Sequence, residues 1–135
     1  MTLGENIGDN GGLNIAFRAL QNVMKTEKLG VKDGFTPEQR FFLAWARVWA
    51  GNARPEYLQY LMTVDVHSPN EARVNGALPM VDSWYKAFNI KKGDKLFVPK
   101  NKRAHNLDIK TINNKKVLQV YACKTFLSNH YFVPK

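Results

Sequence analysis

The sequence has little that could carry covalent or complete metal chemistry by itself. Its single cysteine, Cys123, excludes an internal disulfide. No His-Glu-x-x-His, Cys-x-x-Cys, Gly-x-Ser-x-Gly or phosphate-loop motif occurs. The three histidines, His67, His105 and His130, are too far apart to supply two ligands from neighbouring turns of one helix. Because a catalytic zinc ion takes three protein ligands, commonly two histidines and a glutamate, we expect the 135 residues alone to lack a complete catalytic zinc site.

Long apolar runs are missing as well. No stretch approaches the roughly 18 apolar residues that cross a bilayer, so we expect no membrane segment in this chain. The first residues, MTLGENIGDNGG, do not have the basic start and apolar core of a signal peptide. Hydrophobic residues make up 44% of the chain and charged residues 23%, which is typical of one globular domain with its own core.

The net charge of +9 raises the question of nucleic-acid binding. Residues 1–103 carry 15 basic and 10 acidic side chains, whereas residues 104–135 carry 5 and 1. Mixed signs over the body of the chain are typical of a solvated surface rather than of a stripe that follows phosphates. We therefore expect no nucleic acid among the partners, and only the charge of the tail favours one.

Hydrophobic spacing predicts a first helix over residues 5–26, because apolar side chains recur there every three or four positions. Gly11 and Gly12 lie near its start and favour an interruption. Each glycine costs about 1 kcal/mol relative to alanine in a helix. The pair therefore indicates close approach by another backbone.

A second helix has the clearest start signal in the sequence. Thr36 can cap it, Pro37 suits its first turn and Gln39 completes a capping box. The apolar residues continue to Trp49 and lie nearly all round the helix, so we expect it to be buried on most sides.

Shorter elements follow, marked by prolines and polar capping residues. Pro55 opens a helix that we expect to end near Met62. Ser68, Pro69 and Glu71 then give a cap, a proline and an acid, which predict another helix start. Beyond these we expect a helix over residues 80–88, an extended run over residues 96–98, and either a small hairpin or disorder in residues 104–135.

Two pairs of polar residues could carry chemistry. Glu5 and Asp9 lie one helical turn apart, which suits either a solvated acidic helix start or a metal ligand beside a second carboxylate that orients a ligating histidine. His67 and Arg73 are either surface residues or a pair that faces a cleft. In a cleft, a histidine can stabilise an oxyanion and an arginine can bind a peptide carbonyl.

Several stretches, in this order, resemble the C-terminal part of the neprilysin family of zinc endopeptidases. Residues 4–12 resemble the family motif G-E-N-I-x-D-x-G-G, and residues 65–73 resemble D-x-H-S-P-x-x-x-R. Further matches are Phe41-Phe42-Leu43, Val48-Trp49, Arg54-Pro55-Glu56-Tyr57, Phe88 and the stretch from Gly93 to Pro99. The resemblance covers residues 3–103, and several motifs in register make it specific.

The resemblance implies a role for each candidate residue. Glu5 would be a ligand of one zinc ion, completed by two histidines absent from this chain, and Asp9 would orient one of those histidines. His67 would stabilise the tetrahedral intermediate. Arg73 would hold the substrate backbone. Val48 and Trp49 would line the pocket for the residue after the scissile bond.

The resemblance also implies a fold and a function. It predicts a mainly α chain, the C-terminal helical portion of a thermolysin-like zinc metallopeptidase catalytic domain, in residues 1–103, with a short extended C-terminal segment. Residues 104–135 match nothing in the family and form a basic tail. The implied activity is that of a zinc metalloendopeptidase acting on small and medium peptides.

The missing His-Glu-x-x-His helix favours an inactive fragment that needs the upstream half of its own catalytic domain. The implied localisation is extracytoplasmic, whether periplasmic, secreted or membrane-anchored, and the lack of paired cysteines favours a bacterial source. A non-catalytic helical interaction module with a basic tail is the alternative.

Overall fold

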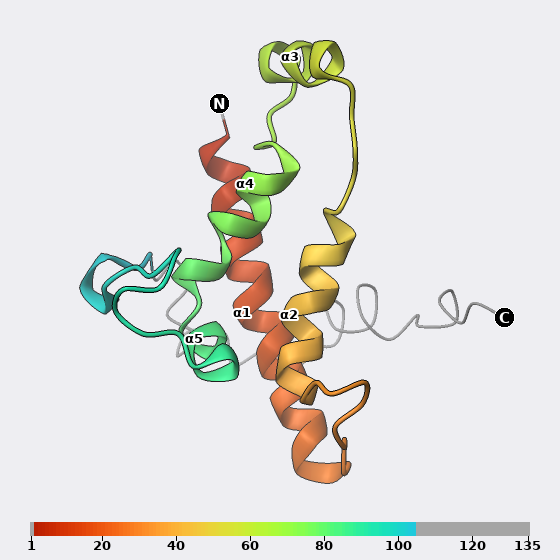
Figure 1. The fold of residues 1–135 in the computed structure, drawn as a ribbon, viewed down its shortest axis with the longest axis vertical. Coiled ribbons are helices and arrows are strands. Elements are labelled where there is room, and N and C mark those ends of the chain that lie inside the picture. The colour runs from red at the N-terminus through yellow and green to blue at the C-terminus, as the bar shows by residue number, and fades with distance from the viewer. Residues whose placement is uncertain (1, 105–135) are drawn as a thin grey trace, which may run out of the picture.

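The computed structural model describes residues 2–104, and these residues are mainly helical (Figure 1). The predicted hairpin in the tail, together with Cys123, His105 and His130, lies outside the described residues. Within residues 2–104 no β-strand forms, and one isolated bridge joins Lys32 to Phe35. The helices are α1 (Leu3–Thr26), α2 (Pro37–Val48), α3 (Pro55–Val64), α4 (Asn70–Asn75) and α5 (Asp82–Phe88), with 3-10 turns η1 (Leu78–Met80) and η2 (Lys100–Lys102).

Helix α1 runs along the long axis of the molecule (Figure 1). The interruption predicted at its glycine pair is wrong. The helix continues through Gly11 and Gly12 without a break. A Cβ added at Gly12 would meet no atom of the described residues within 4 Å, so no described backbone packs closely on that glycine. The buried side chains of Leu13 and Phe17 anchor this stretch to the core, and their burial outweighs the low helix propensity of glycine.

Helix α2 begins as predicted. The Thr36 hydroxyl accepts the backbone N–H of Gln39 at 3.2 Å, and the Gln39 side chain accepts the backbone N–H of Thr36 at 3.0 Å. The expectation of burial on most sides is wrong. Phe41 and Phe42 are buried on one face, whereas Val48 is 67% exposed. Charged residues share the outer face with apolar ones, which the spacing of the apolar residues alone did not reveal.

The core is an aromatic cluster where α1, α2 and α5 meet. Phe17 stacks on Phe42 with ring centroids 5.1 Å apart, and Phe41 meets both rings edge-on. Val81 is fully buried beside them, and Trp84 joins from α5. Aromatic pairs of this geometry add to the stabilisation from area burial.

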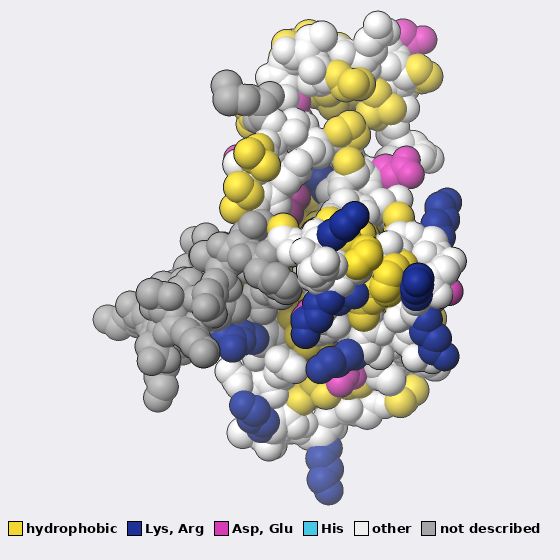
Figure 2. Space-filling model, turned by 90° about the vertical axis from the view of Figure 1, so that its left-hand side faces the viewer, with side chains coloured by type: hydrophobic (Ala, Val, Ile, Leu, Met, Phe, Trp, Pro, Cys, Tyr) yellow, Lys and Arg dark blue, Asp and Glu magenta, His cyan; other side chains and the backbone are white. Residues whose placement is uncertain are grey.

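Helix α3 stands at one end of the molecule, joined to the rest by two loops (Figure 1). It runs two residues further than predicted, and its apolar side chains are largely exposed. Figure 2 shows apolar side chains gathered at this end, while lysines and arginines lie over the body. The exposed apolar residues of α3 are Tyr57, Leu58, Tyr60, Met62 and Val64. Among the described residues, no helix is both long and apolar enough to span a membrane.

The segment after α5 folds back on that helix. The Tyr85 hydroxyl accepts the backbone N–H of Val98 at 2.9 Å and donates to the carbonyl of Pro79 at 2.9 Å. The Arg103 guanidinium lies 3.4 Å from the centroid of the Tyr85 ring. The predicted extended run does not begin at Leu96, because that residue lies in a turn with a φ of 70°.

Candidate functional site

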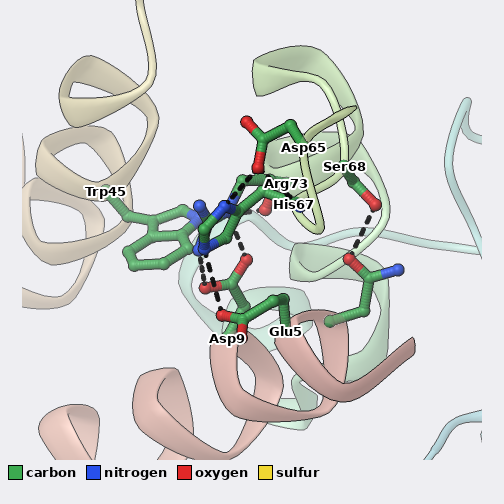
Figure 3. Close-up of polar contacts among 8 residues, drawn as sticks. Glu5, Asp9, Trp45, Asp65, His67, Ser68 and Arg73 are labelled. Carbon is green, nitrogen blue, oxygen red and sulfur yellow. Dashed lines mark hydrogen bonds and ion pairs between the residues drawn. The ribbon is translucent and has the colours of Figure 1, made fainter. Parts of the chain in front are cut away.

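The site forms where the first turns of α1 meet the segment from Asp65 to Arg73 (Figure 3). Four polar contacts join the two segments, between residues that lie 62 or 64 positions apart in sequence. Helix α1 places Glu5 and Asp9 on one face, as their spacing predicted, but in different environments. The Glu5 side chain is 46% exposed, whereas that of Asp9 is 9% exposed.

Arg73 binds Asp9 through both arms of its planar fork. Its Nε donates to Oδ2 at 2.7 Å and its Nη2 donates to Oδ1 at 2.6 Å. The Asp9 carboxylate raises the pKa of Arg73 above its ordinary value, so the guanidinium stays charged although its side chain is only 12% exposed. A buried charge needs such a partner.

Trp45 of α2 and Trp49 at its C-terminal cap both contact the same arginine. The Arg73 guanidinium carbon lies 3.8 Å from the centroid of the Trp49 ring, which is a cation–π contact. The Trp45 indole N–H donates to the backbone carbonyl of Arg73 at 3.3 Å. Arg73 is therefore fixed by three kinds of contact: the ion pair with Asp9, the cation–π contact with Trp49 and the hydrogen bond from Trp45 to its backbone carbonyl.

His67 lies between two carboxylates. Its Nδ1 is 2.7 Å from Asp65 Oδ1, and its Nε2 is 3.2 Å from Glu5 Oε2. The same Asp65 oxygen accepts the His67 backbone N–H at 2.9 Å. That backbone bond first, and the ring second, lower the pKa of Asp65, so it is ionised at neutral pH. With Nδ1–H donated to Asp65, Nε2 can donate only when the ring carries both protons.

A cavity of about 660 Å³ adjoins these groups. His67, Arg73 and Trp49 line it together with apolar residues of α3, including Leu61. The Trp49 indole nitrogen is buried and has no hydrogen-bond partner in the described part of the chain. Val48, which we predicted beside Trp49 in a substrate pocket, is not among the residues that line this cavity. Its substrate role stays a prediction.

Within residues 2–104, no group of three His, Cys, Asp or Glu side chains is placed to hold a metal ion. Glu5 fits the role of a single ligand, since zinc accepts carboxylate oxygens and this carboxylate is accessible. The described residues therefore fit one ligand of a zinc site and not the whole set.

Sequence reasoning missed three contributors to the site. Asp65 stands two residues before His67 in the quoted motif, and an acid in an Asp-x-His pattern is the signal that could have identified it. Trp45 lies among the apolar residues of the second predicted helix, which we expected only to be buried. The hydrogen bond from the Ser68 hydroxyl to Asn6 Oδ1, at 2.8 Å, could not be predicted because it joins residues 62 apart.

A helical scaffold that brings a carboxylate, a histidine and an arginine to one cavity suits a portion of a metallopeptidase catalytic domain. Comparison with known proteins agrees. The family model described as Peptidase family M13 matches residues 1–104. The chain belongs to this family.

Individual relatives give the extent of the match. Human neprilysin is 46% identical over 94 residues, which are 67% of this chain and 12% of that protein. Endothelin-converting enzyme 1 of Rattus norvegicus is 46% identical over 80 residues, 57% of this chain and 10% of the relative. The cryo-EM structure of the Mycobacterium tuberculosis zinc metalloprotease Zmp1 in its open state superimposes with a TM-score of 0.73 at 41% identity, covering 77% of this chain and 16% of that one. The chain thus spans about an eighth of the length of its curated relatives.

Proposed function

We propose that this chain supplies one zinc ligand and the substrate-facing groups of a zinc-dependent metalloendopeptidase. The observation that carries the proposal is that His67 and Arg73 line one cavity, while Glu5, from a distant segment, lies 3.2 Å from His67 Nε2. Family membership supports the peptidase class. The substrates would be small and medium peptides.

In this proposal Glu5 is one of three protein ligands of the metal. The other two and the general base would come from an upstream part of the same catalytic domain, because this sequence contains no His-Glu-x-x-His motif. When bound, zinc would polarise the water that attacks the peptide bond. The 135-residue chain alone would then show no turnover with added zinc.

His67 would stabilise the oxyanion that develops at the scissile carbonyl. Its Nε2 already points to a negatively charged oxygen, that of Glu5, at 3.2 Å. Asp65 would accept the hydrogen bond of Nδ1–H and so fix the direction of the ring. Donors aimed at developing charge are among the largest contributions to catalysis.

Arg73 would hold a backbone carbonyl of the substrate. Asp9 would position Arg73 through the two bonds described above and would also orient a ligating histidine. Both roles are compatible, since an ionised carboxylate has about four lone-pair sites and Arg73 uses two of them. The stacked ring of Trp49, with Val48 nearby in sequence, would favour an apolar residue after the scissile bond.

The resemblance to membrane-bound and secreted peptidases leads us to propose an extracytoplasmic location, periplasmic, secreted or membrane-anchored. One relative is named membrane metallo-endopeptidase-like 1, from Homo sapiens, and is 41% identical over 96 residues. Both animal and mycobacterial proteins are among the relatives, so the proposed bacterial source rests on the cysteine content alone.

A chimera provides the test. Residues 2–104 of this chain would replace the matching segment of the mycobacterial Zmp1, which has a similar fold. We expect peptide hydrolysis by the chimera. His67→Ala should lower kcat by about a hundredfold or more with a small change in KM. Glu56→Ala, on exposed α3, is the matched control and should change neither. A raised KM with unchanged kcat would instead assign His67 to substrate binding.

A non-catalytic interaction module is the second candidate, and the exposed apolar side chains of α3 favour it. Such a module would not need the acidic pair or His67. Chimeras that bind a partner equally well after Glu5→Ala and His67→Ala, and that hydrolyse no peptide before those changes, would support this alternative.

A further inference from the structure

Ser68 does not act as the helix cap that its sequence context predicts. Helix α4 begins at Asn70, its N-cap residue is Pro69, and no side chain caps it. The Ser68 hydroxyl instead donates to Asn6 Oδ1 at 2.8 Å (Figure 3). A residue type that favours helix caps thus forms a long-range bond between two segments.

This bond lies beside the contact between Glu5 and His67. Asn6 follows Glu5 in α1, and Ser68 follows His67 in the loop. Two adjacent bonds therefore join the same two stretches, one of 3.2 Å between the candidate functional groups and one of 2.8 Å between their neighbours.

The loop has few other constraints at this end. The loop begins at the C-terminal end of α3. The apolar side chains of that helix are largely exposed, so they contribute little packing that would hold the loop in place. The ion pair of Arg73 and Asp9 fixes α4 one turn further along α1. Between that ion pair and α3, the described residues place two polar contacts between the loop and α1, and the bond from Ser68 to Asn6 is the one that involves no candidate functional group.

We propose that Asn6 and Ser68 are a positioning pair that sets the distance between His67 and Glu5. Ser68 also lines the cavity, but its hydroxyl is bonded to Asn6, and the pair acts through its neighbours. Its importance for catalysis rests on the function proposed above. The spatial claim concerns the 135-residue chain itself and is tested without metal.

The test follows the ring nitrogens of His67 by NMR in the ¹⁵N-histidine-labelled chain, at fixed pH, with His67→Ala to assign the signal. Glu5→Gln should shift the Nε2 resonance in the parent chain. In a Ser68→Ala background most of that response should disappear, and Asn6→Ala should have the same effect. Ser68→Thr retains a hydroxyl and should restore the response.

Thr63→Ala is the matched control, because it removes an exposed hydroxyl bond of 2.7 Å, to the carbonyl of Tyr60, that does not join the two segments. A full response to Glu5→Gln in both the Ser68→Ala and the Asn6→Ala chains would overturn the proposal. A loss of response in Thr63→Ala would also overturn it, because the signal would then report general loosening.

A second measurement uses the chimera. There Ser68→Ala should lower kcat about tenfold while KM changes little, as expected when a catalytic group is slightly misplaced. An inactive chimera would count against the proposed function and leave the NMR result standing. An active chimera that is insensitive to Ser68→Ala would count against the positioning pair.

Discussion

Substitution of Asp9 by alanine is the perturbation whose cost can be derived most directly from the structure. The change removes both acceptors of the Arg73 fork, at 2.7 and 2.6 Å. Arg73 would remain nearly buried, with 12% of its side chain exposed, and with no carboxylate bonded to its guanidinium. Its stacking on Trp49 and the bond from Trp45 to its backbone carbonyl would survive.

The expected loss is large. Removing one partner of a buried ion pair costs about 3–5 kcal/mol, because the other charge stays buried and uncompensated. A domain of this size has a free energy of unfolding of roughly 5–15 kcal/mol. With a urea dependence of about 1.5 kcal/mol per M, the unfolding midpoint should fall by about 2–3 M.

Urea unfolding followed by circular dichroism measures the change. Lys100→Ala is the control, since its partner Asp82 lies 3.9 Å away and the lysine side chain is 78% exposed. An exposed pair of this kind contributes about 0–1 kcal/mol, so the midpoint should hardly move. If Asp9→Ala cost no more than Lys100→Ala, the account of Arg73 as a buried, fixed side chain would be refuted.

A double replacement separates charge from packing. Asp9→Leu with Arg73→Met removes both charges and keeps most of the volume. Because apolar replacements of buried ion pairs are often neutral or stabilising, this variant should regain most of the stability lost in Asp9→Ala. If the double variant were as unstable as Asp9→Ala, the loss of stability would come from packing rather than from the unpaired charge.

Further predictions concern the core, a helix start and one carboxylate. Phe42→Ala should destabilise the chain by about 3–5 kcal/mol in urea unfolding, because the ring is 1% exposed among aromatic neighbours. Thr36→Ala should cost about 0.5–2 kcal/mol through loss of the capping box. His67→Ala should raise the lowered pKa of Asp65 only part of the way toward 3.8, as read from its ¹³C carboxyl shift, because alanine keeps the backbone N–H that contributes most. Since the folded pKa is lowered, this contact stabilises the chain above pH 3.8 and is lost as the pH falls through the folded value.

Local signals predicted local structure well. The start of α2 followed from Thr36, Pro37 and Gln39, because a capping box is formed within four consecutive residues. The prediction that Ser68 caps α4 was wrong. The helix begins at Asn70, and the Ser68 hydroxyl bonds Asn6 instead. The glycine pair of α1 predicted an interruption that does not form, because tertiary packing outweighs the low helix propensity of glycine.

The sequence predicted which residues belong to the candidate site, but it did not predict how they contact one another. Spacing placed Glu5 and Asp9 on one helical face, but nothing local distinguished the exposed carboxylate from the buried one. Pairing of Asp9 with Arg73, 64 residues away, depends on how α4 packs against α1. The motif resemblance named two segments that meet in the structure, whereas their contacts required the fold.

The zinc content of the chimera tests the central claim most directly. We predict that the chimera carrying residues 2–104 binds stoichiometric zinc after dialysis, measured by atomic emission, and that Glu5→Ala loses it. Glu56→Ala should retain the metal. Stoichiometric zinc in the Glu5→Ala chimera would contradict the assignment of Glu5 as a ligand, and with it the proposal that this chain completes a peptidase metal site.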